Sequence, residues 1–97
     1  MRVDIIGFRA DGSYVFMNLE NGEVHHISRP LCSIISEFGK KSNFIEGHQS
    51  YFTNLKFVIR VSKGQRPVFV MRKGKSIPVS RERASKVRKL VRLYLTR

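Results

Sequence analysis

The sequence has a single cysteine and no long apolar run, and each of these scarcities argues against a class of protein. The single cysteine, Cys32, cannot form an intramolecular disulfide, which argues against a small secreted protein and for a reducing compartment. A membrane-spanning helix needs about 20 apolar residues in a row, and no stretch approaches that length. The N-terminal segment MRVDIIGFRADG is interrupted by charge, unlike a signal peptide. We therefore expect a cytoplasmic protein.

Acidic side chains are almost missing after residue 55. Residues 56–97 carry fourteen basic side chains against Glu82 alone, whereas residues 1–55 carry five basic and six acidic ones. The chain has a formal net charge of +12. This segregation predicts a polyanionic partner, because phosphate contacts release counterions and supply most of the non-specific binding energy. Charge alone does not separate DNA from RNA or from an anionic membrane.

Composition predicts one folded domain over residues 1–97. Hydrophobic residues make up 41% of the chain, and the aromatic ones are seven phenylalanines and three tyrosines. That content is too high for a disordered basic tail and suffices for a single modest core. We find no internal repeat, linker or low-complexity tract that would divide the chain.

The first part of the chain predicts β-strands followed by a short helix. Residues 3–8, 14–19 and 23–27 are strand-like, with one turn centred on Asp11-Gly12. Asn21-Gly22 predicts a hairpin with a type I′ turn, whose two central residues need a positive φ. Ser28 is the expected helix N-cap, with Pro30 in the first turn and Gly39 as the stop. The apolar residues of this helix fall at i, i+3, i+4 and i+7: Leu31, Ile34, Ile35 and Phe38.

The middle of the chain predicts further strands. After a loop at residues 40–43, residues 44–53 form two strand pieces around a polar break at His48-Gln49-Ser50. Residues 55–61 alternate as one strand, whose first face would hold Leu55, Phe57, Ile59 and Val61. Two more strands are expected at 67–71, where Pro67 marks a strand start or a sheet edge, and at 76–79.

The C-terminal residues predict a basic amphipathic helix. Ser80 is its expected N-cap, and Glu82 falls in the first turn, where the helix dipole favours an acid. Its apolar stripe would consist of Ala84, Val87, Leu90, Val91 and Tyr94. The fold class is therefore mainly β with short helices, closed by this C-terminal helix.

The polar break at His48-Gln49-Ser50 and the segment at residues 73–83 resemble the LytTR family of bacterial DNA-binding domains. The family pattern is roughly Phe-x-x-x-His-x-Ser-Tyr/Phe-x-x-Asn-Leu, followed by Gly-x-x-x-Pro-(hydrophobic)-Ser-Arg. This sequence meets it at Phe44, His48, Ser50, Tyr51, Asn54, Leu55, Gly74, Pro78, Val79, Ser80 and Arg81. The likeness extends over essentially the whole chain.

The resemblance implies an elongated stack of antiparallel β-sheets. In such domains loops, rather than a recognition helix, enter successive major grooves at direct repeats upstream of promoters. The chain is similar to stand-alone members without a receiver domain, some of which are restrained by a membrane-bound inhibitor protein. The resemblance therefore implies a bacterial transcription regulator, with double-stranded DNA, an inhibitor protein and a second copy on the adjacent repeat as expected partners.

The resemblance also implies roles for individual residues. Arg81 falls on the family's groove-reading arginine, and a guanidinium suits guanine O6 and N7. Gln49 stands where the family usually has Arg or Asn, and its amide suits adenine N6 and N7, which suggests an altered sequence preference. Ser13 is nearest to the family's first reading loop and is expected at a base or a phosphate.

Phosphate contacts position such a protein without specifying sequence. The side chains expected to make them are Arg9, His48, Ser50, Lys73, Lys75, Ser80, Arg83 and Lys86. For His48 the alternative is a structural hydrogen bond that orients the loop. Asn54 is expected to end a strand with a side-chain bond to the backbone.

Other functions find less support in the sequence. No nucleophile elbow, glycine-rich phosphate loop, paired carboxylates or metal-ligand quartet appears, so we expect neither an enzyme, a metal site, a cofactor nor a small-molecule substrate. His25 and His26 point to opposite faces of a strand, and Cys32 reads as a partly buried structural thiol. Two alternatives stay open: a general RNA- or nucleic-acid-binding module, and a protein-interaction module that docks on an acidic partner.

Overall fold

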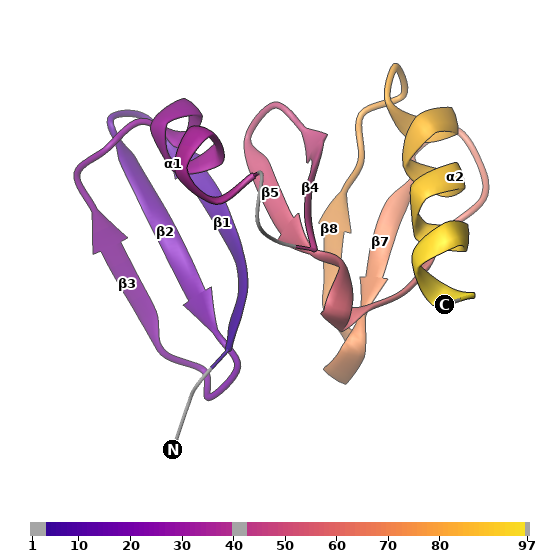
Figure 1. Ribbon diagram of the computed structural model, residues 1–97, viewed down its shortest axis with the longest axis horizontal. Coiled ribbons are helices and arrows are strands. Elements are labelled where there is room, and N and C mark those ends of the chain that lie inside the picture. Colours follow the sequence, from indigo (N-terminus) through magenta and orange to yellow (C-terminus); the bar gives the residue numbers. More distant parts are fainter. Residues whose placement is uncertain (1–3, 40–42, 97) are drawn as a thin grey trace.

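The computed structural model describes residues 4–39 and 43–96, so the predicted strand residue Val3 and loop residues 40–42 lie outside it. Two antiparallel sheets and two helices make up the fold (Figure 1). The first sheet has the order β3-β2-β1-β5-β4 and consists of β1 (Ile5–Asp11), β2 (Tyr14–Leu19), β3 (Val24–Ile27), β4 (Phe44–His48) and β5 (Tyr51–Asn54). The second has the order β6-β7-β8 and consists of β6 (Val58–Val61), β7 (Val68–Met71) and β8 (Ser76–Pro78). The mainly β fold class with a C-terminal helix is confirmed.

Helix α1 (Leu31–Phe38) covers one face of the first sheet. Because side chains alternate along a strand, every second residue of β1, β2 and β5 faces this helix. The buried residues of this first core are Phe8, Val15, Leu31, Ile34 and Phe52. The ring of Phe8 lies 5.7 Å from that of Phe38 and 6.1 Å from that of Phe52, distances that suit aromatic pairs.

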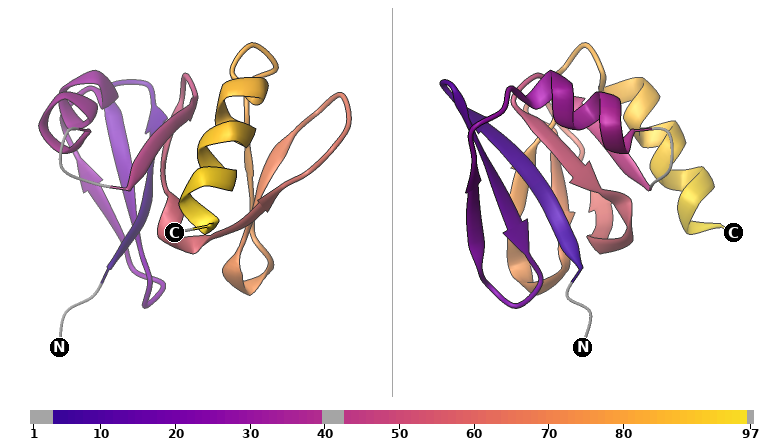
Figure 2. Two further views of the ribbon diagram at one scale, coloured as in Figure 1. Left: turned by 45° about the vertical axis from the view of Figure 1, so that its right-hand side comes forward. Right: turned by 60° about the vertical axis from the view of Figure 1, so that its left-hand side comes forward.

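Helix α2 (Ala84–Leu95) packs against the second sheet and closes a second core. Its predicted apolar stripe is confirmed for Ala84, Val87 and Val91, which are buried, while Leu90 stays exposed. The rest of this core comes from Leu55, Phe57, Val58, Phe69, Met71 and Val79. Both helices lie on the same side of the two sheets, where they border a shared groove (Figure 2).

The two sheets meet where β4 passes β7. At Gly47 a Cβ atom would stand 2.7 Å from Cε2 of Phe69, so only glycine lets the strand approach this fully buried ring. The carbonyl of Gly47 accepts a 2.8 Å hydrogen bond from the amide of Ser80. The domain measures 33 × 31 × 25 Å, so the expected stack of sheets is present but is not elongated.

The strand predicted at residues 55–61 is wrong in its first half. Leu55–Phe57 form a 3-10 turn (η1), which Asn54 begins by accepting the amide of Lys56 at its side-chain oxygen. The turn shifts the alternation, so that Phe57 and Val58 are both buried and Ile59 is 50% exposed. The side-chain amide of Asn54 also donates to the carbonyl of Ile5 at 2.8 Å, which confirms the structural role predicted for this residue.

Two predicted turns differ from expectation, the first in its position and the second in its type. The β1–β2 turn consists of Gly12-Ser13, with φ +62° at Gly12, and strand β1 continues through Arg9 to Asp11. The β2–β3 hairpin is confirmed, but its turn is not type I′. Only Gly22 has a positive φ there, and its amide donates to Leu19 to close a longer loop.

Both predicted N-caps are wrong. Pro30 itself is the N-cap of α1 and is extended (φ −67°, ψ 150°), which leaves Ser28 too far from the first helical amides. Helix α2 begins at Ala84, three residues later than Ser80 would start it, and its first turn holds no acid. Ser80 instead caps the preceding turn, where its hydroxyl oxygen accepts the amide of Arg83 at 3.3 Å.

For Pro67 one of the two expected alternatives is confirmed, whereas the expectation for Cys32 is wrong. Pro67 precedes β7, which is the central strand of the second sheet rather than an edge, so the proline marks a strand start. Cys32 is exposed rather than partly buried. Among the described residues no helix is long and apolar enough to cross a membrane, and no three His, Cys, Asp or Glu side chains gather into a metal-ligand group.

Candidate nucleic-acid interface

Three turns lie at one end of the domain, at the top of Figure 1. They are Gly12-Ser13 between β1 and β2, Gln49-Ser50 between β4 and β5, and the loop from β8 to α2. Two backbone hydrogen bonds of 2.8 Å connect neighbouring turns. The amide of Ala10 donates to the carbonyl of Ser50, and the amide of Ser80 donates to the carbonyl of Gly47. The structure thus brings together the three residues predicted to contact bases, Ser13, Gln49 and Arg81, and all three are exposed.

His48 shapes the second of these turns. Its Nδ1 accepts the amide of Ser50 at 3.1 Å, and its ring meets that of Tyr51 edge-on at 5.5 Å. An accepting Nδ1 leaves the proton of the neutral ring on Nε2, which can donate outward. The half-buried His48 therefore orients the turn, while Gln49 between it and Ser50 points into solvent.

Arg81 is anchored by a segment that sequence reasoning missed. Its Nε donates to the carbonyl of Gln65 at 2.8 Å, in the loop between β6 and β7. The same loop is held on the other side by Arg88, whose Nη2 donates to the carbonyl of Ser62 at 3.1 Å. No pattern in the sequence pairs Arg81 with Gln65, because a backbone carbonyl carries no residue-specific signal.

The two predicted phosphate contacts near α2 differ in accessibility. Lys86 is exposed, whereas Arg83 is half-buried and its Nη1 is fully buried. Among the described residues and their contacts, that Nη1 has no hydrogen-bond partner. Both side chains border the groove between α1 and α2, together with Glu46.

Arg9 belongs to a row of side chains that crosses the first sheet on the face away from α1. Its guanidinium carbon lies 4.7 Å from the ring centre of Phe16, a cation–π contact. The strand register places the members directly opposite one another, in the order His26, Phe16, Arg9, Tyr51 and His48. The row thus connects the outer strand β3 to the turn that carries Gln49. Alternation along each strand indicates which of its residues share a face, but the sequence does not show that β1 pairs with β5.

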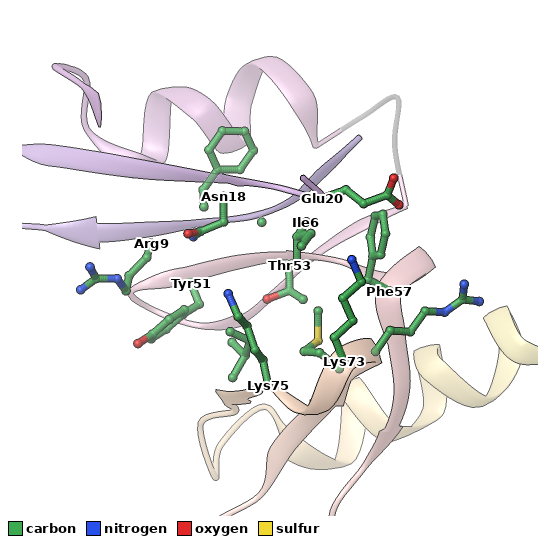
Figure 3. Close-up of a pocket in the computed structure, with 14 residues that line it drawn as sticks. Ile6, Arg9, Asn18, Glu20, Tyr51, Thr53, Phe57, Lys73 and Lys75 are labelled. Atoms are coloured by element: carbon green, nitrogen blue, oxygen red, sulfur yellow. The ribbon is translucent and has the colours of Figure 1, made fainter. Parts of the chain in front are cut away.

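Lys73 and Lys75 are not brought to this end. They lie at the turn between β7 and β8, at the bottom of Figure 1, where Lys73 has a φ of +70°. Their side chains reach back toward the first sheet (Figure 3). Lys73 and Lys75 therefore form a cationic site apart from the three turns.

One cation of residues 56–97 already forms an ion pair. The ammonium of Lys56 donates to the carboxylate of Asp4, and this hydrogen bond raises the pKa of Lys56 above its ordinary value. Glu23, on the loop before β3, has its pKa lowered by hydrogen bonds from His25 and Asn21. Neither pair lies among the three turns.

Two antiparallel sheets, with exposed turns and cationic side chains at one end, make up a small β-rich domain. The chain belongs to the LytTr DNA-binding domain family, whose model matches residues 3–92. A solved structure, the LytTr DNA-binding domain of a Bacillus cereus protein described as a methyl-accepting/DNA response regulator, has the same fold with a TM-score of 0.77. It is 24% identical in sequence, over 90% of this chain and 80% of that one. No curated protein matches the chain.

Family membership makes the chain a DNA-binding protein of transcription regulation, and its fold is that of a binding domain rather than a catalytic one. The predicted likeness to the LytTR family is thus confirmed.

Proposed function

We propose that the chain is a sequence-specific regulator that binds double-stranded promoter DNA by inserting its three clustered turns into the major groove. The observation that carries this proposal is the hydrogen-bonded connection of the turns at one end of the domain. A set of loops held at fixed spacing by two sheets can meet a rigid duplex without prior ordering, which limits the entropic cost of binding.

In this proposal Arg81 and Gln49 specify the site. Only Nε of Arg81 donates to the backbone carbonyl of Gln65. Both terminal nitrogens of the guanidinium therefore stay available for guanine O6 and N7. Gln49 reads adenine through its amide. Ser13, with a short side chain on the first turn, contacts a base edge or the adjoining phosphate.

Phosphates would be held around these turns by Arg9, His48 through Nε2, Ser50, Ser80, Arg83 and Lys86. Each lies on or next to one of the turns or at the start of α2, except Arg9, which pairs across the strands with Tyr51 beside the second turn. Lys73 and Lys75 lie at the far end, so we do not assign them to the same stretch of duplex. A second copy on an adjacent direct repeat would extend the contact along one side of the DNA.

The test begins with selection of bound duplexes from a random DNA library at near-physiological salt. Enrichment of a short site is expected. Arg81→Ala and Gln49→Ala should each then cost about 1–3 kcal/mol on the enriched site and relax one base position. Lys75→Ala is the matched control, because it removes a charge at the opposite end and should leave base preference unchanged.

A flat selection would overturn the proposal and favour a general nucleic-acid-binding module. Equal losses on enriched and random DNA for Arg81→Ala would count against direct base reading by this residue.

A further inference from the structure

A cavity of about 350 Å³ lies between the first sheet and the β7–β8 hairpin, on the face away from both helices (Figure 3). We call it the inter-sheet groove. Its walls come from β1, β2 and β5 on one side and from β7, β8 and their turn on the other. Its volume falls within the range of small-molecule sites, about 300–1,000 Å³.

The floor of the inter-sheet groove is apolar. It is lined by Ile6, Phe57, Met71 and Ile77. Gly7 also lines the groove but is buried, with the carbonyl oxygen of Phe52 3.0 Å from the position that a Cβ atom would take. Phe57 and Met71 are buried, whereas Ile6 and Ile77 are half-buried, so the two isoleucines provide most of the apolar surface that an apolar ligand could cover.

Two ammonium groups extend across this floor. Figure 3 shows the side chains of Lys73 and Lys75 extending from their hairpin toward the first sheet. Among the described residues neither lysine forms an ion pair or a side-chain hydrogen bond, and the one acid in the lining, Glu20, is not within ion-pair distance of either.

The hairpin holds these lysines in place. Lys73 is the one described residue other than glycine with a positive φ, and Gly74 follows with φ +81°. The amide of Met71 donates to the carbonyl of Lys75 at 2.8 Å and closes the turn. Both lysines are exposed, so their charges are accessible to an anionic group that lies over the groove.

We propose that the inter-sheet groove binds a small amphipathic monocarboxylate, with its acyl or aryl body on the apolar floor and its carboxylate between Lys73 and Lys75. Charge and shape together select this class. An inorganic anion would leave the floor in water, and a neutral apolar molecule would leave the lysines without a partner. Sequence analysis predicted no small-molecule ligand, because the floor and the lysines come from segments far apart in the chain.

This site is inferred independently of the proposed function, although the groove shares Arg9 with the proposed phosphate contacts. It nevertheless touches the same strands, since Tyr51 lines the groove and directly follows the Gln49-Ser50 turn. Arg9, which also lines the groove, pairs with Tyr51 across β1 and β5.

The test is a titration of the isotopically labelled protein, without DNA, followed by amide chemical shifts. Octanoate and 4-phenylbutyrate are the two probes, which separate an acyl from an aryl preference. Saturable shifts confined to the groove walls are expected with at least one probe. Acetate and 1-octanol, which lack the apolar body and the charge respectively, should bind more weakly than the better probe.

Variants decide whether the lysines hold the carboxylate. The double variant Lys73→Gln/Lys75→Gln should lose affinity about tenfold, as expected when charge-assisted hydrogen bonds are removed. Lys63→Gln/Lys89→Gln removes the same charge from two exposed lysines, one in the β6–β7 loop and one in α2, that do not line the groove, so it should leave affinity unchanged. Glu20→Gln should tighten binding. The proposal is overturned if neither probe shifts the groove, if 1-octanol binds as well as octanoate, or if the two double variants behave alike.

Discussion

The Nε atom of Arg81 donates a 2.8 Å hydrogen bond to the backbone carbonyl of Gln65. This contact turns a long, flexible side chain into one with a fixed direction. Side-chain ordering on binding costs about 0.5–1.5 kcal/mol for such a residue, so part of that cost is already met in the free protein. Arg81 also lies next to Ser80, whose amide joins this loop to β4.

Replacement of Arg81 by lysine separates charge from geometry. The Arg81→Lys variant keeps its charge but loses the paired donors that suit guanine, so it should cost about 1–3 kcal/mol on the enriched site. Binding to random DNA should change little. Fluorescence anisotropy with both duplexes checks this, and a lysine variant that matches the wild type on the enriched site would exclude bidentate reading.

A second prediction concerns the contact between the two sheets. The Gly47→Ala variant places a Cβ atom 2.7 Å from the ring of Phe69 and should lower the free energy of unfolding by about 1–3 kcal/mol through overpacking. Urea unfolding measures the loss. The double variant Gly47→Ala/Phe69→Leu is the control, because a smaller side chain at 69 makes room for the methyl group. If the two substitutions are simply additive, the close contact does not limit stability.

Sequence patterns predicted the elements better than their junctions. The stripe of α2 and the hairpin around Gln49 were readable because periodicity and turn residues are local signals. The break at Leu55–Phe57 was not, since the side chain of Asn54 replaces a strand by a 3-10 turn without changing the apolar pattern.

In the candidate site, too, local features were predictable and the arrangement of distant segments was not. Ser13, Gln49 and Arg81 were predicted through the family resemblance, and the fold places them at one end. The distance of Lys73 and Lys75 from that end was not predictable, because it depends on how the β7–β8 hairpin is oriented in the second sheet. The row from His26 to His48 likewise depends on the pairing of β1 with β5.

The ion pair between Lys56 and Asp4 predicts a weak pH dependence of stability. The hydrogen bond from the Lys56 ammonium to Asp4 raises the pKa of Lys56 in the folded state above the ordinary value of 10.5. A group with a raised folded pKa stabilises the fold below its unfolded pKa and loses that effect as the pH rises through the folded value. Stability should therefore fall slightly above pH 10.5.

The measurement is the urea midpoint as a function of pH for the wild type and for Lys56→Gln. Because the lysine is exposed, the difference should be small, and it should disappear at the alkaline end of the range. A Lys56→Gln variant with the same midpoint as the wild type at every pH would show that the pair contributes nothing to stability.

Salt dependence distinguishes the two ends of the domain. The logarithm of the DNA-binding constant should fall with the logarithm of salt concentration by about 0.9 for each phosphate contacted. Lys86→Gln, at the start of α2, should remove one phosphate contact and therefore reduce the magnitude of the slope by about 0.9. Lys75→Gln, at the β7–β8 hairpin, should leave the slope unchanged although it removes the same charge. Anisotropy titrations on one duplex at several salt concentrations provide both slopes. Equal reductions in the two variants would mean that DNA reaches the inter-sheet groove, and the separation of the two cationic sites would then be wrong.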